Sequence, residues 1–537
     1  MKRLLITLSI VGAVLTACAQ ANQSGQIPQS TQVSITGGLA EGTWNDGIYS
    51  YKGIPYAHAE RFQRPMDPEP WQGLRKFDTY GQMSGQNFMG FGGQQRPNMG
   101  DDCQNLNVWT PAINDGKKRP VMVWLHGGGF ESGSSQSADT DGETLSRQGD
   151  VVVVSVNHRL NILGFLDLSA YGDRFRHSGN AGIIDIIAAL RWIKNNIAVF
   201  GGDPENITLF GESGGGAKII ILAASPFAKD TFQKGIIESG AVESLGMRVT
   251  PQSTARLVTE ALLQKLGIDA DHVDDLVTMP YDQLNAAGNE ALREVATRLG
   301  LKDGFNNPGN MSWAPTVDGE FLPEQPVTDH TIGQSMDIPL IIGTNFSEMA
   351  GMQAMFSQDF QTNNKTTWTD AEKREKLVAQ FGDKTDEVVN AFKKAYPNRP
   401  EIDVLYIDTW IRSNSLKYLG IRAKEGGAPV YSYVFNYETN PLMLVPHTAE
   451  IAYVFNNVGA NAMMGGATPE AKEVALKMSQ AWINFAHTGN PSQPGLEWTP
   501  FTTASRGTML FDKQSEMRTD FDDDLMKLLV SDYDFMP

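Results

Sequence analysis

The segment Asn206 to Gly216 reads NITLFGESGGG, in which a short apolar run leads directly into a serine that stands among glycines. The run Ile207 to Phe210 has the length and the β-branched, apolar character of a strand inside a sheet. Gly211 and Gly215 lie two residues to either side of Ser213, where the lack of a side chain relieves crowding in a sharp turn from strand to helix. The Ser213 hydroxyl would then project above the sheet edge, at the start of a helix. We therefore expect an α/β protein built around this turn.

Other short and nearly continuous apolar runs have the character of parallel strands that are covered on both faces. They are Val121 to Leu125, Val151 to Val156, Ile338 to Ile342 and Val430 to Phe435. Helical patterns lie between them, and the clearest spans residues 185–198. Its apolar face carries Ile186, Leu190, Ile193 and Ile197. Strands that alternate with helices predict a central, mostly parallel sheet with helices on both faces.

Two longer segments are charge-rich and helical in pattern, without strand-like runs. They span residues 252–300 and 367–425, approximately. We expect them to form helical excursions over one rim of the sheet, within a single α/β domain that spans residues 33–537.

The net charge of the chain indicates which classes of binding partner are expected. The 537 residues include 44 basic and 62 acidic side chains, which give a formal net charge of −18 and a pI near 4.9. This charge repels phosphate backbones, so nucleic acid is not an expected partner. An acidic balance is compatible with a cationic substrate, but it is also what keeps an exported protein soluble.

The N-terminus has the layout of an export signal. Lys2 and Arg3 precede an apolar run from Leu4 to Ala17, which at 14 residues is too short to span a bilayer. The run ends in Leu-Thr-Ala-Cys18, which resembles the cleavage box of bacterial lipoproteins, in which the Cys thiol receives the lipid. We expect residues 1–17 to be a lipoprotein signal peptide and Cys18 to be the lipidated start of the mature chain. An ordinary cleaved signal with an incidental cysteine is the alternative.

The composition after Cys18 predicts a membrane-anchored chain on a tether. Residues 18–32 are rich in Gln, Ser, Asn and Ala, with almost no large apolar side chains, which is typical of a flexible linker. Ala19 resembles the residue found in lipoproteins that are sent on to an outer membrane, facing the periplasm. Cys103 is the only other cysteine, so no disulfide within the chain is expected. No later stretch reaches the roughly 18 apolar residues of a membrane span, which leaves the lipid as the only expected membrane contact.

Upstream of Ser213, the run that ends at Leu125 leads into His-Gly127-Gly128-Gly129-Phe. Consecutive glycines let backbone N–H groups converge on a small space with no side chains in the way. Such a loop can bind an oxyanion, and it accompanies a Gly-x-Ser-x-Gly turn in hydrolytic enzymes. A flexible turn is the plainer interpretation.

Longer stretches of the chain resemble type-B carboxylesterases, a family that includes cholinesterases and bacterial para-nitrobenzyl esterases. The segments that carry the resemblance are YKGIPYA at Tyr51 to Ala57, DDCQNLNVW at Asp101 to Trp109, HGGGF at His126 to Phe130, NHRLNILGFL at Asn157 to Leu166, GNAGIIDIIAALRWIKNNIAVFGGDPENITLFGESGGG at Gly179 to Gly216, and AWINFAHTGNP at Ala481 to Pro491. The resemblance implies an α/β-hydrolase fold and the hydrolysis of carboxylic esters by a serine mechanism. It implies no cofactor and no metal.

The resemblance also implies a catalytic triad in the order Ser, Glu, His. Ser213 would be the nucleophile, and Glu348, which ends the segment GTNFSE, would be the acid. His447 would be the base, because it opens HTAEIAYVF, which looks like the H-G-x-E segment of the family. Asp318 is a competing carboxylate, but the resemblance places it before the strand that carries the acid. His487 also follows Glu348, where a capping or packing role fits better.

Further residues of the site follow from the same resemblance. Backbone N–H groups of three glycines would bind the oxyanion, namely Gly128, Gly129 and Gly214. Three more residues match a buried hydrogen-bonded network of the relatives, namely Glu212, Ser239 and Glu450. Because buried carboxylates need partners wherever they occur, a structural role and a catalytic role are both open for this network.

The chain departs from the family pattern at several positions. Gly214 stands where the family usually has Ala, and Thr448 stands where it has Gly. Cys103 has no partner for the disulfide that animal relatives form. Counting back from Cys103 places Gly93 where cholinesterases carry the Trp that stacks on choline, so a choline ester is not an expected substrate.

Together these features predict a carboxylesterase that acts on small or medium, moderately apolar esters through an acyl-enzyme on Ser213. Thioesters, lactones and amides share this acyl chemistry and stay open as substrates, and the oligomeric state is open as well. The contrasting hypothesis is a non-catalytic surface protein of the same fold. The presence of Ser213, Glu348 and His447 argues against it.

Overall fold

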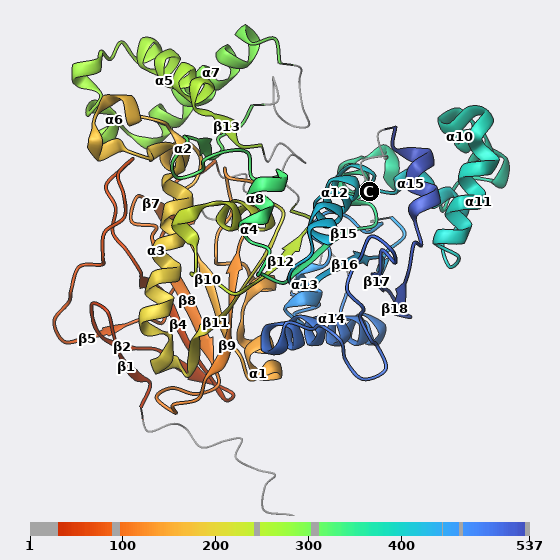
Figure 1. Ribbon diagram of the computed structural model, residues 1–537, viewed down its shortest axis with the longest axis horizontal. Helices are drawn as coiled ribbons and strands as arrows, with labels where there is room; N and C mark the ends of the chain where they lie inside the picture. Colours follow the sequence, from red (N-terminus) through yellow and green to blue (C-terminus); the bar gives the residue numbers. More distant parts are fainter. Residues whose placement is uncertain are drawn as a thin grey trace, which may run out of the picture.

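The computed structural model describes residues 30–87, 97–240, 248–301, 311–442, 444–460 and 466–531 (Figure 1). The predicted signal peptide, Cys18, the tether up to residue 29 and Gly93 lie outside these ranges. The described chain enters its first strand, β1, at Gln32. In these ranges, no helix combines the length and the apolar character that crossing a membrane requires.

A sheet of eleven strands runs through the molecule in the order β18-β17-β16-β15-β12-β11-β9-β10-β8-β4-β3 (Figure 1). The strands are β3 (Thr43–Asn45), β4 (Ile48–Pro55), β8 (Asn105–Thr110), β9 (Arg119–Leu125), β10 (Val152–Val156), β11 (Gly202–Glu212), β12 (Lys234–Glu238), β15 (Leu340–Asn345), β16 (Val430–Phe435), β17 (Thr508–Phe511) and β18 (Glu516–Arg518). All pairings from β10 through to β17 are parallel, and the outer strands join antiparallel. The predicted mostly parallel sheet is therefore confirmed.

Smaller sheets lie outside this one. They pair β1 (Gln32–Ile35), β2 (Gly38–Glu41) and β5 (Leu74–Lys76), β6 (Met83–Ser84) with β7 (Met99–Gly100), and β13 (Thr250–Pro251) with β14 (Thr316–Val317).

Helices lie on both faces of the large sheet (Figure 1). The helices of the described ranges are α1 (Glu143–Gly149), α2 (Asn161–Phe165), α3 (Ala181–Asn196), α4 (Gly214–Ala224), α5 (Gln252–Leu266), α6 (Asp275–Thr278), α7 (Tyr281–Arg298), α8 (Asp329–Gly333), α9 (Glu348–Phe356), α10 (Asp370–Phe381), α11 (Thr385–Ala395), α12 (Trp410–Glu425), α13 (Ile451–Val454), α14 (Pro469–Thr488) and α15 (Asp523–Leu529). The helix predicted over residues 185–198 is α3, which starts earlier, at Ala181. It passes at its end into a 3-10 turn, Ile197–Phe200.

The two faces of the sheet contribute to two hydrophobic cores, because successive side chains of a strand point to opposite sides. Val121, Val123 and Leu125 of β9 join one core, with apolar side chains of α3 and α4. Met122 and Trp124 join the other, with side chains of α1 and α14. Because β9 is buried on both faces, its sequence reads as one continuous apolar run.

The two predicted helical excursions lie at opposite ends of the molecule, and one is shorter than expected (Figure 1). Residues 252–300 form α5, α6 and α7, in which α5 packs on α7. Within residues 367–425, α10 and α11 lie at the far end, but α12 differs from the expectation and packs on β15 and β16. Neighbouring parallel strands need a connection that returns across a sheet face, and α12 makes that crossover.

Candidate active site

Ser213 occupies a sharp turn between β11 and α4. Its φ of 55° and ψ of −121° are strained for a residue with a side chain. Its backbone N–H donates to the carbonyl oxygen of Glu238, at the end of the neighbouring β12, at 2.8 Å. The turn packs closely against the end of β9. A Cβ on Gly211 would lie 2.6 Å from the Leu125 carbonyl oxygen, and a Cβ on Gly215 would lie 1.9 Å from it. Only glycine at both positions permits this approach.

Glu348 and His447 reach the same edge of the sheet because they follow two adjacent parallel strands. Glu348 begins α9 just after β15, and His447 follows β16 in the loop before α13. Oε2 of Glu348 lies 2.6 Å from Nδ1 of His447. The backbone N–H of His447 also donates to the carbonyl oxygen of Glu348, at 3.1 Å. Both side chains are buried, so the structure brings these two predicted residues together away from bulk water.

The second oxygen of Glu348 is held by two donors. Oε1 accepts from the Ser239 hydroxyl and from the backbone N–H of Asn345, each at 2.6 Å. The Ser239 hydroxyl also lies 3.2 Å from Oε1 of Glu450. The side-chain Nδ2 of Asn345 donates to Oε2 of Glu450 at 2.5 Å. Ser239 and Asn345 therefore bridge two buried carboxyl groups and turn Glu348 so that Oε2 faces His447. Burial and the charge of Glu348 raise the pKa of Glu450 to about 7.

Glu212 ends β11 beside Ser213 and is buried. Its Oε1 lies 3.2 Å from Nε2 of His447, but neither atom has a hydrogen-bond partner in the described part of the chain. Burial raises the pKa of Glu212 well above its usual value. The nearby His447 charge opposes this rise, and the charges of Glu450 and Glu348 add to it. Burial therefore favours the protonated, neutral form of Glu212.

The basicity of His447 results from opposing effects. Burial lowers its pKa, but the carboxylates of Glu212 and Glu348 outweigh burial and raise it. Of these two carboxyl groups, only that of Glu348 makes a hydrogen bond with the imidazole, at Nδ1. Nε2 makes no hydrogen bond to Ser213 or to any other described residue. In active sites such contacts often close only when substrate is bound, so Nε2 is free to take a proton.

The glycine loop after β9 lies against the start of α4. Gly128 and Gly129 have φ of 83° and 62°, left-handed values that favour glycine. A Cβ on Gly214 would lie 2.1 Å from the Gly129 carbonyl oxygen, so loop and helix are in direct contact. Among the described residues, no backbone hydrogen bond is donated by the N–H of Gly128, Gly129 or Gly214. These donors are free for an oxyanion.

Two buried charged residues beside the site were not predicted. Glu238 ends β12 opposite Glu212 in the sheet, and its Oε1 accepts from Nε1 of Trp482 at 2.8 Å. Lys218 lies in α4, where its Nζ donates to the His126 carbonyl oxygen at 2.8 Å. The available signal was a charged residue within an apolar run, as in KGIIES and GAKIIIL.

The competing residues lie elsewhere. Oδ2 of Asp318 is 2.8 Å from Nδ1 of His177 rather than beside His447. Nε2 of His487 lies 2.9 Å from the carbonyl oxygen of Gly149, which fits a packing role in α14. Across the ranges that the structure describes, no three His, Cys, Asp or Glu side chains are grouped as a metal site.

The sequence profile of the carboxylesterase family matches residues 29–527. The chain belongs to the carboxylesterase family. Members of this family are serine hydrolases, and this carboxylesterase is accordingly an enzyme that cleaves carboxylic esters. The matched region includes Ser213, Glu348 and His447.

Relatives of this carboxylesterase cover most of its length. Para-nitrobenzyl esterase of Bacillus subtilis (strain 168) is 33% identical over 494 residues, which cover 90% of this chain and 95% of the relative. Fumonisin B1 esterase of Sphingopyxis macrogoltabida is 30% identical over 504 residues, or 90% and 86% of the two chains. The solved structure of an esterase from Clostridium hathewayi, which can hydrolyse aliphatic aromatic polyesters, has a TM-score of 0.83 at 35% identity, covering 96% of this chain and 99% of that one. These similarities confirm the α/β-hydrolase fold.

Proposed function

We propose that this carboxylesterase works through an acyl-enzyme on Ser213, with His447 as general base and acid and Glu348 as the residue that orients it. The 2.6 Å contact between Oε2 of Glu348 and Nδ1 of His447, beside the turn that carries Ser213, supports this most directly. With Nδ1–H donated to the carboxylate, Nε2 of the neutral imidazole is the nitrogen that accepts a proton.

In the first half of the reaction, Oγ of Ser213 attacks the carbonyl carbon of the ester while its proton passes to Nε2 of His447. The carbonyl electron pair moves onto oxygen, and the N–H groups of Gly128, Gly129 and Gly214 donate to that oxyanion. The bond to the alkoxy oxygen then breaks, and His447 returns the proton to the departing alcohol.

In the second half, water replaces the alcohol. It loses a proton to His447 as its oxygen attacks the acyl carbon, and the oxyanion forms again at the same donors. Collapse breaks the bond to Ser213, whose oxygen takes back the proton, and the carboxylic acid leaves.

The buried network around the triad holds Glu348 in position and limits the number of negative charges near His447. The Ser239 hydroxyl holds Glu348 in place at 2.6 Å. The pKa of Glu450 is about 7, so in weakly acidic conditions this carboxyl group is largely protonated and does not place a second full negative charge beside Glu348. Burial raises the pKa of Glu212, which favours its neutral form beside the imidazole and limits the negative charge around His447.

We infer small or medium, moderately apolar carboxylic esters as the substrates. The names of similar proteins refer to para-nitrobenzyl esters, to fumonisin B1 and to aliphatic aromatic polyesters, so one scaffold accommodates acyl and alcohol groups of different size. Thioesters, lactones and amides react through the same steps. A panel of para-nitrophenyl esters of rising acyl length, run beside a thioester, a lactone and an anilide, ranks these classes by kcat/KM.

The same panel tests the assignment of Ser213. Ser213→Ala should lower kcat at least about a thousandfold for every ester, because the attacking oxygen is lost. Ser413→Ala removes a hydroxyl from α12, outside the site, and should retain the wild-type rate. Undiminished hydrolysis by Ser213→Ala refutes the assignment. A wild type that cleaves no ester, thioester or lactone supports a non-catalytic binding protein instead.

We also propose that the protein is an exported bacterial lipoprotein, attached to the outer membrane through lipid on Cys18 and facing the periplasm. This rests on the basic, apolar and Leu-Thr-Ala-Cys segments of residues 1–18 and on Ala19. Cys18→Ser should yield a soluble exported protein or an unprocessed precursor, seen by membrane fractionation. Cys103→Ser changes a buried thiol and is the control. Unchanged membrane partitioning of Cys18→Ser counts against lipidation.

A further inference from the structure

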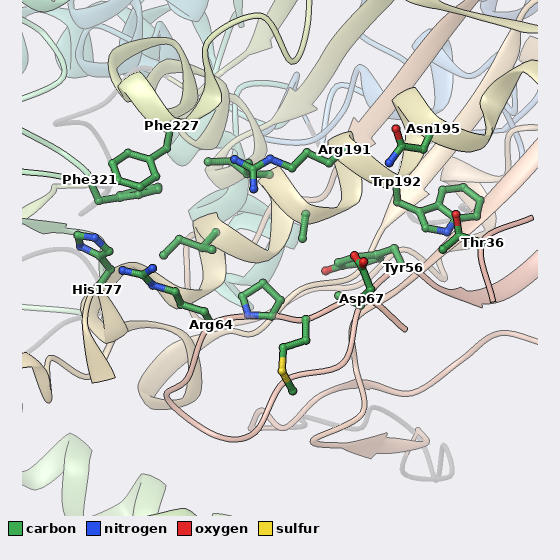
Figure 2. Close-up of a pocket in the computed structure, with 16 residues that line it drawn as sticks. Thr36, Tyr56, Arg64, Asp67, His177, Arg191, Trp192, Asn195, Phe227 and Phe321 are labelled. Carbon is green, nitrogen blue, oxygen red and sulfur yellow. The ribbon is translucent and has the colours of Figure 1, made fainter. Parts of the chain in front are cut away.

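A cavity of about 310 Å³ opens beside α3, and none of its lining residues belongs to the network around Ser213 and His447 (Figure 2). Apolar side chains of α3, among them Ile184 and Ile187, form one wall, and the segment Arg64 to Asp67 forms another. Sites for small molecules have volumes of about 300–1,000 Å³. The cavity therefore has room for one compact ligand.

Two arginines, Arg64 and Arg191, line this cavity. Figure 2 shows both side chains reaching toward the end where His177, Phe227 and Phe321 lie. Neither guanidinium group has an ion pair or a hydrogen bond to another side chain in the part of the chain that is described. Both residues are exposed, so their guanidinium groups are solvated in the free protein and can exchange water for an anionic group.

Acidic side chains near this end have other partners. Glu320 is held by Arg176, whose Nε donates to Oε2 at 3.1 Å. This hydrogen bond is the main cause of the lowered pKa of Glu320, and the charge of Arg64 adds to it, which places Arg64 near this carboxylate. Asp318 is bonded to His177 at 2.8 Å. Neither of these carboxylates makes a hydrogen bond or an ion pair with Arg64 in the described part of the chain.

Aromatic rings form the wall beside the two guanidinium groups. The ring centroids of Phe227 and Phe321 lie 5.3 Å apart, and the His177 ring lies 5.5 Å from that of Phe227. Phe227 is 36% exposed, although its ring contacts both of the others. A flat apolar group in the cavity would cover this exposed part, which is favourable because it removes apolar surface from water.

The other end of the cavity is polar without being cationic. Figure 2 shows Asp67 there, with Tyr56, Trp192 and Asn195. Trp192 is buried, and its Nε1–H lacks an acceptor among the described residues. The Asp67 carboxylate opposes a second negative charge at this end, so a ligand with one anionic group fits better than a dianion.

From this arrangement we propose that the cavity binds an organic monoanion with a flat apolar body, of the aryl carboxylate class. Its anionic group lies at the end of the cavity that Arg64 and Arg191 reach, because a planar guanidinium group matches the two oxygens of a carboxylate. Its ring packs on Phe227 and Phe321. Binding here uses no residue of the ester-cleaving site and holds whatever the roles of the triad residues.

The test compares 2-naphthoate with 2-naphthamide, a ligand of nearly the same shape without the charge, by isothermal titration calorimetry of the full-length protein. Naphthoate should bind at least about tenfold more tightly than naphthamide, because only naphthoate makes charge-assisted hydrogen bonds. In Arg64→Gln/Arg191→Gln, naphthoate should bind about tenfold more weakly, while the affinity for naphthamide stays the same.

Arg293→Gln/Arg298→Gln is the matched control, because it removes two exposed positive charges from α7, outside the cavity. It should bind naphthoate like the wild type, and both double variants should hydrolyse para-nitrophenyl acetate at the wild-type rate. Phe227→Ala should weaken both ligands. The proposal is wrong if naphthoate shows no saturable binding, if naphthamide binds as tightly, if Arg64→Gln/Arg191→Gln keeps wild-type affinity, or if Phe227→Ala changes neither ligand.

Discussion

A Cβ atom on Gly214 would lie 2.1 Å from the carbonyl oxygen of Gly129 and 2.6 Å from its Cα, so the start of α4 and the glycine loop approach more closely than a larger residue allows. The atoms that such a Cβ would meet belong to the backbone, which cannot rotate out of the way as a side chain can. Both residues contribute N–H groups to the proposed oxyanion site. Their separation therefore sets the geometry of that site.

We expect Gly214→Ala to lower kcat for para-nitrophenyl esters by about tenfold to a hundredfold. The methyl group forces the glycine loop away from α4, and misplacing one oxyanion donor costs up to about 10²–10³ in rate. Gly333→Ala, in α8, is the control, because a Cβ there meets no atom within 4 Å. Full activity of Gly214→Ala in steady-state assays would show that the loop moves without loss of the donors.

Burial favours the protonated form of Glu212, and this predicts how the pH profile responds to its replacement. Gln has the shape and neutrality of a protonated Glu, so Glu212→Gln should move the acid limb of kcat/KM by less than about 0.5 pH unit. An ionised Glu212 at 3.2 Å from Nε2 of His447 would behave differently. Its removal would lower the pKa of His447 and move the limb to lower pH by about one unit or more.

Glu205→Gln is the control for this profile, since Glu205 lies at the exposed start of the same strand, β11, and pairs with Lys194 at 3.2 Å. Both variants are compared with the wild type over the full pH range, with one ester. A shift of the acid limb by a unit in Glu212→Gln, with none in Glu205→Gln, would show that Glu212 carries a charge in the free enzyme.

The turn at Ser213 and the strands beside it could be predicted because short local patterns determine them. Gly211 and Gly215 are required by contacts with the Leu125 carbonyl oxygen that any such turn makes. Glu348 and His447 came from a family resemblance, and the structure gives its physical basis. Their strands are parallel neighbours, so their ends meet at one edge of the sheet.

Other features depend on contacts that sequence patterns do not contain. Glu238 ends an apolar run, and only the pairing of β11 with β12 places it opposite Glu212. The bridging role of Asn345 depends on how the chain folds back between β15 and α9. The charge-rich sequence of α12 predicts a helix outside the sheet. In the structure α12 packs on the sheet as the crossover between β15 and β16, because these two strands are parallel neighbours.

Lys218 carries the last prediction, because it lies fully buried in α4 behind the turn at Ser213. Burial lowers its pKa to about 7. In an unfolded chain a lysine titrates near pH 10.4. Between these values the unfolded state binds more protons at this position than the folded state does, so the contribution of Lys218 to the free energy of unfolding rises with pH across that window. Below about pH 7 both states are protonated, and the folded protein bears the full cost of a buried charge.

Lys218→Met keeps the length of the side chain and removes the titrating group. The free energy of unfolding of the wild type minus that of Lys218→Met should therefore increase as pH rises from about 7 to about 10, and should be constant below about 6. Loss of the hydrogen bond to the His126 carbonyl oxygen shifts this difference equally at every pH, so the slope reports the titration alone. Lys472→Met, at an exposed position of α14, is the control and should give no slope. Urea unfolding across this range measures the difference, and a value for Lys218→Met that stays constant with pH would mean that the buried ammonium group keeps its ordinary pKa.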